Sequence, residues 1–285
     1  MIFDTHAHYA HRAFMGECSY LARGEGGFEV RRGELQKIFG DLAAAGIVGT
    51  IEPGVTIASN EAILALSKDY PVYPAVGVHP TRAVQERWSD RRALEKLSLA
   101  HGVVAIGETG LDYHLGRSQQ YRLRQLGWFV YQLELAKKRD LPVILHIRDA
   151  HSHALRVLRH YRGKLRGVVH CFSGDDALAR AYVALGWHLG IGGTVLQKGD
   201  RADALRGALK SVPLEWLLVE TDSPFILPDL TGIMPGKLRR RARNTSLILP
   251  AVIEEIARIK GLSPEEVERV TTQNACRLFG LPEPH

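Results

Sequence analysis

The stretch Ile2-Phe3-Asp4-Thr5-His6-Ala7-His8 opens the chain as an apolar, strand-like run that ends in two histidines. Four later apolar runs also end in residue types that bind metals: Glu108 after 103–107, His146 after 141–145, His170 after 167–169, and Asp222 after 216–221. In a barrel of parallel strands, the carboxyl ends meet on one face, where active sites are built. We therefore expect these six side chains to form one thiolate-free site for one or two divalent ions, as in a metal-dependent hydrolase.

Apolar runs alternate with stretches of helical periodicity along the whole chain. Strands are predicted at 2–6, 47–52, 72–78, 103–108, 142–147, 167–171, 187–192 and 216–222. Helices are predicted near 33–45, 56–69, 90–100, 118–139, 149–161, 175–185, 200–211 and 245–260. This alternation predicts an α/β fold with a parallel sheet closed into a (β/α)8 TIM barrel, and an additional C-terminal helix at about 264–278 over its outside. A doubly wound open sheet is the alternative, although no G-x-G-x-x-G follows the first strand.

The chain has 285 residues, of which 45% are hydrophobic, and this fits one hydrolase domain over 1–285. Acidic Asp4 stands where a secretory leader would be basic, and no uncharged run approaches the roughly eighteen residues that span a bilayer. We expect a cytoplasmic protein without membrane contact, and no obligate protein partner is evident. The three cysteines are widely separated and form no CxxC pair, so neither a disulfide framework nor a thiolate zinc site is indicated.

Net charge biases the protein toward polyanions. The chain carries 37 basic and 31 acidic residues, which gives a charge of +6 and a pI near 9.3. A modest basic excess is also common on solvated surfaces that bind no nucleic acid. The charge alone therefore leaves both interpretations open.

The two H-x-H pairs of the chain are predicted to differ. Alternate residues of a strand face the same side, so His6 and His8 can bind one ion together. His151-Ser152-His153 has the same spacing but begins a predicted helix, where residues two apart point in different directions. We expect that second pair to be exposed to solvent.

Glu108 has the strand parity of Val104 and Ile106, which we expect to face inward. A buried carboxylate needs a cation, and between two ions it can bridge both at roughly 3.5–4 Å separation. A salt bridge to an arginine is the alternative.

We expect His6, His8 and Asp222 to bind one ion and His146 and His170 to bind the second. Asp222 is also the best candidate for the general base. Glu220 should face the same side as Asp222, either behind a ligand or against the substrate.

Six ordered motifs resemble those of the TatD family of metal-dependent deoxyribonucleases. They are Phe3-Asp4-Thr5-His6-Ala7-His8, Gly77-Val78-His79-Pro80, Ile106-Gly107-Glu108-Thr109-Gly110-Leu111-Asp112, His146-Ile147-Arg148-Asp149-Ala150, His170-Cys171-Phe172-Ser173-Gly174 and Glu220-Thr221-Asp222-Ser223-Pro224. The resemblance implies an amidohydrolase-type TIM barrel with metal ligands at His6, His8, Glu108, His146, His170 and Asp222. It also implies that Glu108 is the bridging carboxylate, where related amidohydrolases use a carboxylated lysine. Members commonly hydrolyse DNA phosphodiesters, often as 3′ exonucleases.

Other residues of these motifs are candidates for substrate binding. Arg148 can hold a phosphate with its planar fork, and backbone amides around Ser173 lie at a helix start suited to anions. His79 could contact the scissile phosphate or a base, or instead form a hydrogen bond within its loop. Tyr113 could stack on a terminal base, or serve only in packing. Glu220 and Arg243 complete the set.

Two long segments depart from the usual family pattern. Residues 9–32 form a longer first loop than expected, and residues 229–243 form an extended loop after the eighth strand. The second loop carries a basic cluster of Lys237, Arg239, Arg240, Arg241 and Arg243. We expect this cluster to hold a nucleic-acid backbone, and a solvated loop is the alternative.

These expectations converge on an enzyme that cleaves DNA phosphodiester bonds, in an exonucleolytic manner, through two divalent ions (Zn, Mg or Mn) and a metal-activated water. Glu108 and Asp222 are its candidate catalytic residues, and DNA or an oligonucleotide is its substrate. The same centre can polarise a carbonyl, so a deacylase or amidohydrolase acting on a small ester or amide is the alternative. A binding protein that has lost catalysis is disfavoured, because no ligand position is substituted.

Overall fold

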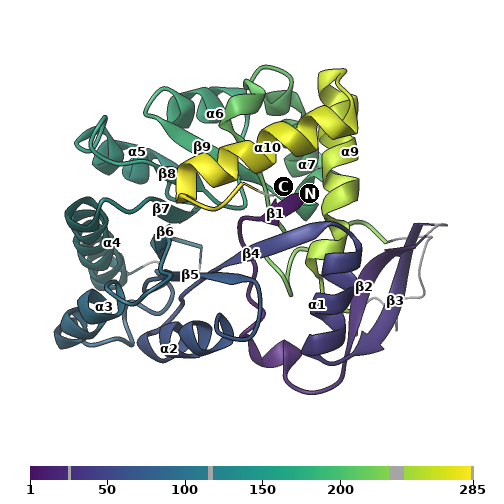
Figure 1. The fold of residues 1–285 in the computed structure, drawn as a ribbon. Coiled ribbons are helices and arrows are strands. Elements are labelled where there is room, and N and C mark those ends of the chain that lie inside the picture. Colours follow the sequence, from purple (N-terminus) through teal and green to yellow (C-terminus); the bar gives the residue numbers. More distant parts are fainter. Residues whose placement is uncertain (25–26, 115–117, 231–240, 284–285) are drawn as a thin grey trace.

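The computed structural model describes residues 1–24, 27–114, 118–230 and 241–283, and its fold is a (β/α)8 arrangement (Figure 1). Eight strands form one parallel sheet in chain order. They are β1 (Ile2–Asp4), β4 (Ile47–Pro53), β5 (Val72–Val76), β6 (Ala105–Asp112), β7 (Val143–Arg148), β8 (Gly167–Val169), β9 (Trp187–Ile191) and β10 (Leu217–Val219). Each predicted strand is thereby confirmed.

The two edge strands of this sheet lie side by side. Thr5 N donates to Val219 O at 3.1 Å, and Asp222 N donates to His6 O at 2.8 Å. A parallel bridge between Ala7 and Ser223 continues the same pairing. The residues that follow β1 and β10 are therefore held together on one face of the molecule.

A helix follows each strand and covers the sheet. The helices are α1 (Leu35–Ala44), α2 (Ile57–Leu66), α3 (Arg91–Leu97), α4 (Gln119–Arg139), α5 (His151–Arg159), α6 (Asp176–Val183), α7 (Asp200–Leu209) and α9 (Leu249–Lys260). Their ends follow local chemistry: the Ser118 side chain accepts from Tyr121 N, and Gly261 ends α9 in the left-handed conformation at φ 67°. None of the helices in the described part of the chain is both long and apolar enough to span a bilayer.

A separate buried cluster fills the space that the strands enclose. It takes one residue from each of seven strands: Phe3, Ile51, Ala75, Ala105, Ile144, Val168 and Leu218. The larger cluster lies between the strands and the surrounding helices. Two layers of this kind are typical of a barrel with a packed interior.

The C-terminal helix α10 (Pro264–Phe279) does not lie where we predicted. Its residues Ala275, Leu278 and Phe279 join the interior cluster instead of packing over the outside of the barrel. Asn274 Nδ2 donates to Leu217 O at 2.9 Å, and Thr272 Oγ1 donates to Met1 O at 2.8 Å, so α10 contacts the beginnings of β10 and β1. The helix therefore covers the end of the barrel opposite the carboxyl ends of the strands.

Part of the predicted loop 9–32 is a β-hairpin, which the sequence analysis missed. β2 (Cys18–Gly24) pairs antiparallel with β3 (Gly27–Gly33). Leu21 N donates to Arg243 O and Arg243 N donates to Ser19 O, both at 2.8 Å, so the chain after β10 adds to the hairpin edge. Arg243, at the end of the second segment that departs from the family pattern, is thereby paired with the first.

Candidate metal centre

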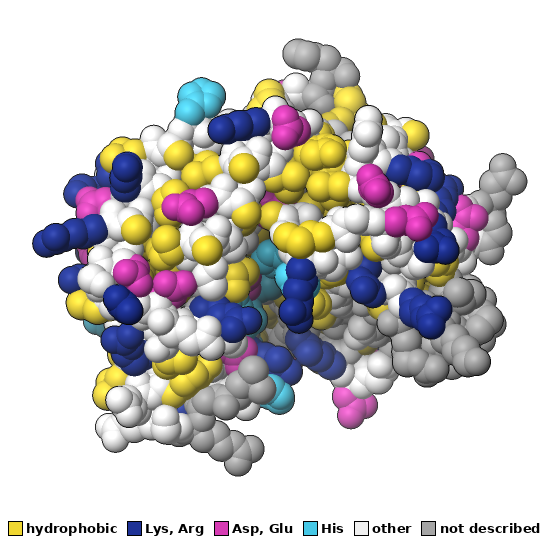
Figure 2. All heavy atoms as spheres, turned by 90° about the horizontal axis from the view of Figure 1, so that it is seen from below, with side chains coloured by type: hydrophobic (Ala, Val, Ile, Leu, Met, Phe, Trp, Pro, Cys, Tyr) yellow, Lys and Arg dark blue, Asp and Glu magenta, His cyan; other side chains and the backbone are white. Residues whose placement is uncertain are grey.

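The six predicted ligands converge where the carboxyl ends of the strands meet. A cavity of about 620 Å³ opens there, and its wall includes His8, Glu108, His146, His170 and Asp222. His6 is fully buried beside it. Figure 2 shows this face from below, with histidine side chains inside a hollow and Lys and Arg side chains near its rim.

Glu108 stands between two sets of histidines and turns one carboxylate oxygen to each set. Its Oε2 lies 3.7 Å from His6 Nε2 and 3.8 Å from His8 Nε2. Its Oε1 lies 2.8 Å from His146 Nδ1 and 2.7 Å from His170 Nε2. A carboxylate placed in this way can bridge two cations.

Glu108 reaches this position through an irregularity in β6. Ile106 pairs with Val143 and Thr109 pairs with Leu145, so three steps along β6 match two along β7. Ile106 packs in the outer cluster, against the helices, so the predicted inward parity of Ile106 is wrong. The extra residue reverses the alternation after Ile106 and turns Glu108 inward.

Asp222 completes the set around the first histidine pair. Its Oδ1 lies 3.6 Å from His6 Nε2 and 3.5 Å from His8 Nε2, and the two Nε2 atoms are 3.2 Å apart. Ligand atoms at about 2.0–2.2 Å from a tetrahedral ion are themselves roughly 3.3–3.6 Å apart. The spacing and the donor types of these residues therefore fit a divalent ion.

The backbone of Asp222 is in the left-handed region, at φ 54°, which non-glycine residues adopt uncommonly. The hydrogen bond from Asp222 N to His6 O holds this conformation next to the H-x-H segment. Such local strain is typical of functional sites, where the surrounding structure sustains it.

Two further carboxylates lie behind the second histidine pair. Asp112 Oδ2 is 3.2 Å from His146 Nε2, and Glu220 Oε1 is 3.6 Å from His170 Nδ1. Gln125 of α4 fixes Asp112 by accepting from its N and donating to its O, both at 2.9 Å. Carboxylates behind histidine ligands orient the ring and raise its basicity.

Glu220 depends on a glycine for its space. A Cβ atom at Gly190 would lie 2.0 Å from Glu220 Oε2, so only glycine leaves room for this carboxylate beside β9. The Glu220 side chain is 1% exposed. It therefore acts on His170 from behind and does not face the cavity.

The electrostatics of the site keep Glu108 ionised and shift the pKa values of the surrounding histidines in opposite directions. Burial raises the pKa of a carboxyl, but the charges of His79 and His170 and hydrogen bonds from His146 and His170 hold the pKa of Glu108 well below its usual range. Burial, followed by the charge of His170, holds the pKa of His6 well below its usual value. Burial lowers the pKa of His170, but the charges and hydrogen bonds of Glu108 and Glu220 together outweigh burial and raise that pKa well above its usual value. Glu108 thus attracts positive charge to its position.

A family model, TatD related DNase, matches residues 3–280. The chain belongs to the TatD family. It is 32% identical over 283 residues to the uncharacterized metal-dependent hydrolase YabD of Bacillus subtilis, covering 99% of this chain and 100% of that protein. It is 37% identical over 240 residues to the 3′-5′ ssDNA/RNA exonuclease TatD of Cronobacter sakazakii, covering 83% and 88%. The crystal structure of YJJV, a TatD homolog from Escherichia coli K12, superposes with a TM-score of 0.81 at 28% identity, covering 99% and 98%.

These findings confirm the predicted family and make this TatD-family protein a metal-dependent hydrolase. Among the residues that the structure describes, three groups of side chains could hold a metal ion, each with ligand atoms within 4.8 Å of one another. They are His6, His8 and Asp222; His6, Glu108 and His170; and His79, Glu108 and His146.

His79 is more central than predicted. It lines the cavity, and its Nε2 lies 3.3 Å from Glu108 Oε1. Thr81 N donates to His79 Nδ1 at 3.1 Å and orients the ring. Of the six predicted substrate-binding residues, His79 is the one that the structure brings into the cavity wall formed by described residues.

The other five predicted substrate-binding residues lie elsewhere. Arg148 is exposed at the end of β7, and Ser173 Oγ accepts from Arg201 Nε at 2.7 Å. Glu220 is behind His170, and Arg243 pairs with the hairpin. Tyr113 lines a separate pocket.

The basic cluster of the loop after β10 falls mostly outside the described residues. Lys237, Arg239 and Arg240 are in that part of the chain, whereas Arg241 and Arg243 are described. Arg243 Nη1 donates to Arg241 O at 2.8 Å. The predicted role of the cluster stays a prediction.

The cavity wall also contains residues that sequence reasoning missed. Arg12 and Arg82 bring positive charge, Glu52 is buried, and Phe225 is 48% exposed. Arg12 follows the H-x-H pair and Arg82 follows the Gly77–Pro80 motif, so their position in strand-end loops was the available signal. Asp112 ended a motif that we quoted, but no role was assigned to it.

Proposed function

We propose that this TatD-family hydrolase cleaves phosphodiester bonds at an end of single-stranded DNA, with two divalent ions bridged by Glu108. The observation that carries the proposal is the placement of Glu108, with Oε2 facing His6 and His8 and Oε1 facing His146 and His170. Two bridged ions are typical of enzymes that displace groups at phosphorus. The relative from Cronobacter sakazakii, 88% of whose length is matched by this chain, is named a 3′-5′ ssDNA/RNA exonuclease, and this name supports the substrate class.

In this proposal His6, His8 and Asp222 bind one ion, and His146 and His170 bind the other. When bound, the ions would lower the pKa of a coordinated water and polarise the phosphate oxygens. Carboxylate ligands permit Mg²⁺ or Mn²⁺, whereas four histidines favour Zn²⁺.

The chain's own residues then position the substrate and move the proton. The Asp222 side chain is 16% exposed in the cavity wall, so a carboxylate oxygen can accept the proton of the attacking water. Arg12 and Arg82 bind phosphate, and the partly exposed ring of Phe225 stacks on a base. The interior cluster, which includes Ile144 and Val168, fills the barrel below the metal centre, so the cavity does not continue through the barrel. A closed cavity of this kind suits the end of a DNA strand better than its middle.

The test is an assay of metal-loaded protein on end-labelled single-stranded and double-stranded DNA, RNA, bis(p-nitrophenyl) phosphate and a p-nitrophenyl ester. We expect mononucleotides to be released from one end of single-stranded DNA and the small phosphodiester to be cleaved more slowly. Asp222→Asn is the matched control for contaminating nucleases. Rapid ester hydrolysis without cleavage of either phosphodiester would instead support the deacylase alternative.

A further inference from the structure

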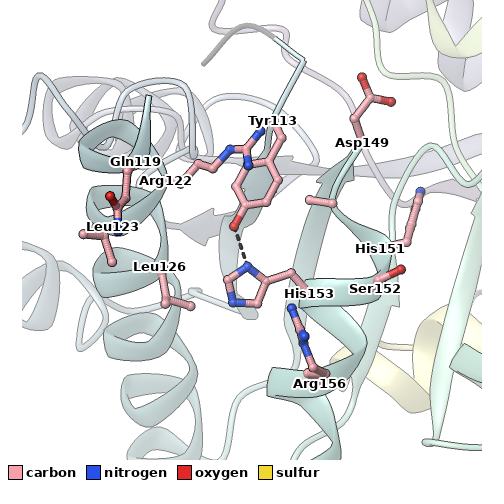
Figure 3. A pocket seen from close by; sticks show the side chains of 11 residues that line it. Tyr113, Gln119, Arg122, Leu123, Leu126, Asp149, His151, Ser152, His153 and Arg156 are labelled. Atoms are coloured by element: carbon pink, nitrogen blue, oxygen red, sulfur yellow. Dashed lines mark hydrogen bonds between the residues drawn. The ribbon is translucent and has the colours of Figure 1, made fainter. Parts of the chain in front are cut away.

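A second pocket lies between the beginnings of α4 and α5 (Figure 3). Its volume is about 600 Å³. Arg122, Leu123 and Leu126 line it from α4, and His153 and Arg156 line it from α5. Tyr113, from the loop that follows β6, stands between the two helices.

The two arginines of this pocket form no salt bridge among the described residues, and the carboxylate that also lines it, Asp149, lies 2.9 Å from His114 Nδ1. Both side chains are exposed, and within the described ranges neither guanidinium pairs with a carboxylate. Arginines of the hairpin differ, because Arg23 pairs with Glu254 at 2.8 Å and Arg32 pairs with Glu17 at 2.9 Å. The pocket therefore offers two cations to an anionic ligand, whereas the hairpin does not.

The aromatic ring in the pocket is held in a fixed orientation. Tyr113 Oη and His153 Nδ1 are 2.6 Å apart, within hydrogen-bonding distance. The guanidinium carbon of Arg122 lies 4.5 Å from the centre of the Tyr113 ring. Leu123 is 58% exposed, which adds an apolar surface next to this stack. A nucleotide matches this pocket. Its flat base suits the planar groups and the apolar surface, and its phosphate suits the arginines.

The backbone connects this pocket to the metal centre. Tyr113 directly follows Asp112, the carboxylate behind His146. Tyr113 N also donates to Arg148 O at 2.9 Å, two residues after His146. Gly110 pairs with His146, and at about 3.3 Å per residue the backbone of Tyr113 lies roughly 10 Å further along the strand direction. A strand whose terminal phosphodiester is at the metal centre can reach this pocket.

We propose that this pocket is a second subsite, which binds a nucleotide of the single-stranded substrate a few positions from the scissile bond. The inference rests on the proposed function and extends it. Arg122 and Arg156 contact phosphates, and the base lies against Leu123, Leu126 and the stacked pair of Tyr113 and Arg122. The subsite makes the affinity for the substrate depend on its length.

The test compares KM for oligothymidylates of two to twelve nucleotides between the wild type and the double variant Arg122→Ser/Arg156→Ser. We expect KM for the twelve-mer to rise about tenfold in the variant, while KM for the dinucleotide, which cannot span both sites, does not change. Single-strand contacts contribute about 0.7 units of log-log salt slope each, so the salt dependence of twelve-mer binding should fall by about 1.4 units. Arg159→Ser is the control for charge, because it removes one arginine from an exposed position of α5 outside the pocket.

Each outcome separates the subsite from the proposed function. If the wild type cleaves the twelve-mer and the double variant matches it in KM and salt slope, the subsite is wrong while the proposed function stands. An equal loss in Arg159→Ser would show a general charge effect and would also overturn the subsite. If the wild type hydrolyses only the ester, the proposed function fails and the subsite fails with it. Hydrolysis of bis(p-nitrophenyl) phosphate verifies that each variant is folded.

Discussion

Two H-x-H segments of this protein have identical spacing and opposite structural outcomes. His6 and His8 follow a strand and turn their Nε2 atoms to within 3.2 Å of each other. His151 and His153 begin α5 and face different partners, with His151 Nδ1 2.9 Å from Tyr182 Oη and His153 Nδ1 2.6 Å from Tyr113 Oη. The backbone that carries an H-x-H pair therefore decides whether its rings converge, and the spacing alone does not.

The comparison also corrects the prediction for the second pair. We expected solvent-exposed side chains, yet both rings are partly buried and lie within hydrogen-bonding distance of tyrosines. At the beginning of α5 the two residues point toward α6 and toward the loop after β6. A helix start that packs against neighbours therefore anchors its histidines instead of exposing them.

The largest contrast should appear when each pair loses one histidine. His8→Ala removes a proposed ligand, so we expect metal content to fall and turnover of bis(p-nitrophenyl) phosphate to drop on the order of 10³–10⁵-fold. His151→Ala leaves the Tyr182 hydroxyl without this partner, so we expect the free energy of unfolding to fall by about 1–2 kcal/mol with metal content unchanged. Elemental analysis and urea denaturation measure the two effects. Equal metal loss in both variants would refute the distinction.

A variant of Asp222 tests whether this residue only binds metal beside His6 and His8 or also accepts a proton from the attacking water. If Asp222 only binds metal, saturating metal should restore the turnover of Asp222→Asn. We expect the rate to stay depressed by roughly 10²–10⁴-fold at saturating metal, because the amide cannot accept the proton. Turnover measured over a metal titration decides between the two, and recovery to near the wild-type rate would remove the general-base role.

Smaller effects should follow changes behind the ligands. Glu220→Gln keeps the shape of the side chain but removes the charge next to His170, so we expect metal affinity to fall about 10–100-fold. Asp112→Asn should act similarly through His146. Competition with a chelating dye measures the affinity, and Glu215→Gln, an exposed site before β10, is the control. Unchanged affinity in both variants would show that these carboxylates only fill space.

Much of the site was predictable because it follows from strand topology. The ends of parallel strands meet on one face, so His146, His170 and Asp222 could be placed together without coordinates. Their parity also holds, since Ile144, Val168 and Leu218 face the barrel interior two or four residues earlier. Periodicity is a reliable guide where a strand is regular.

The remaining features depend on irregular or long-range structure. Glu108 is in the predicted place, but through an extra residue in β6 that the periodicity of the sequence does not reveal. The hairpin escaped prediction because Tyr20, Leu21 and Ala22 are all buried, so its first strand lacks the alternation of a half-exposed one. Loop residues such as Tyr113 were assigned to the metal cavity because sequence alone does not give the direction of a loop.

The central claim is that Glu108 bridges two ions, and metal stoichiometry tests it most directly. Glu108→Gln keeps the size of the side chain but removes the charge that faces both histidine pairs. We predict about two ions per chain in the wild type, fewer in the variant by elemental analysis, and a fall in turnover by orders of magnitude. Two ions per chain in Glu108→Gln together with an unchanged rate would contradict the bridging role.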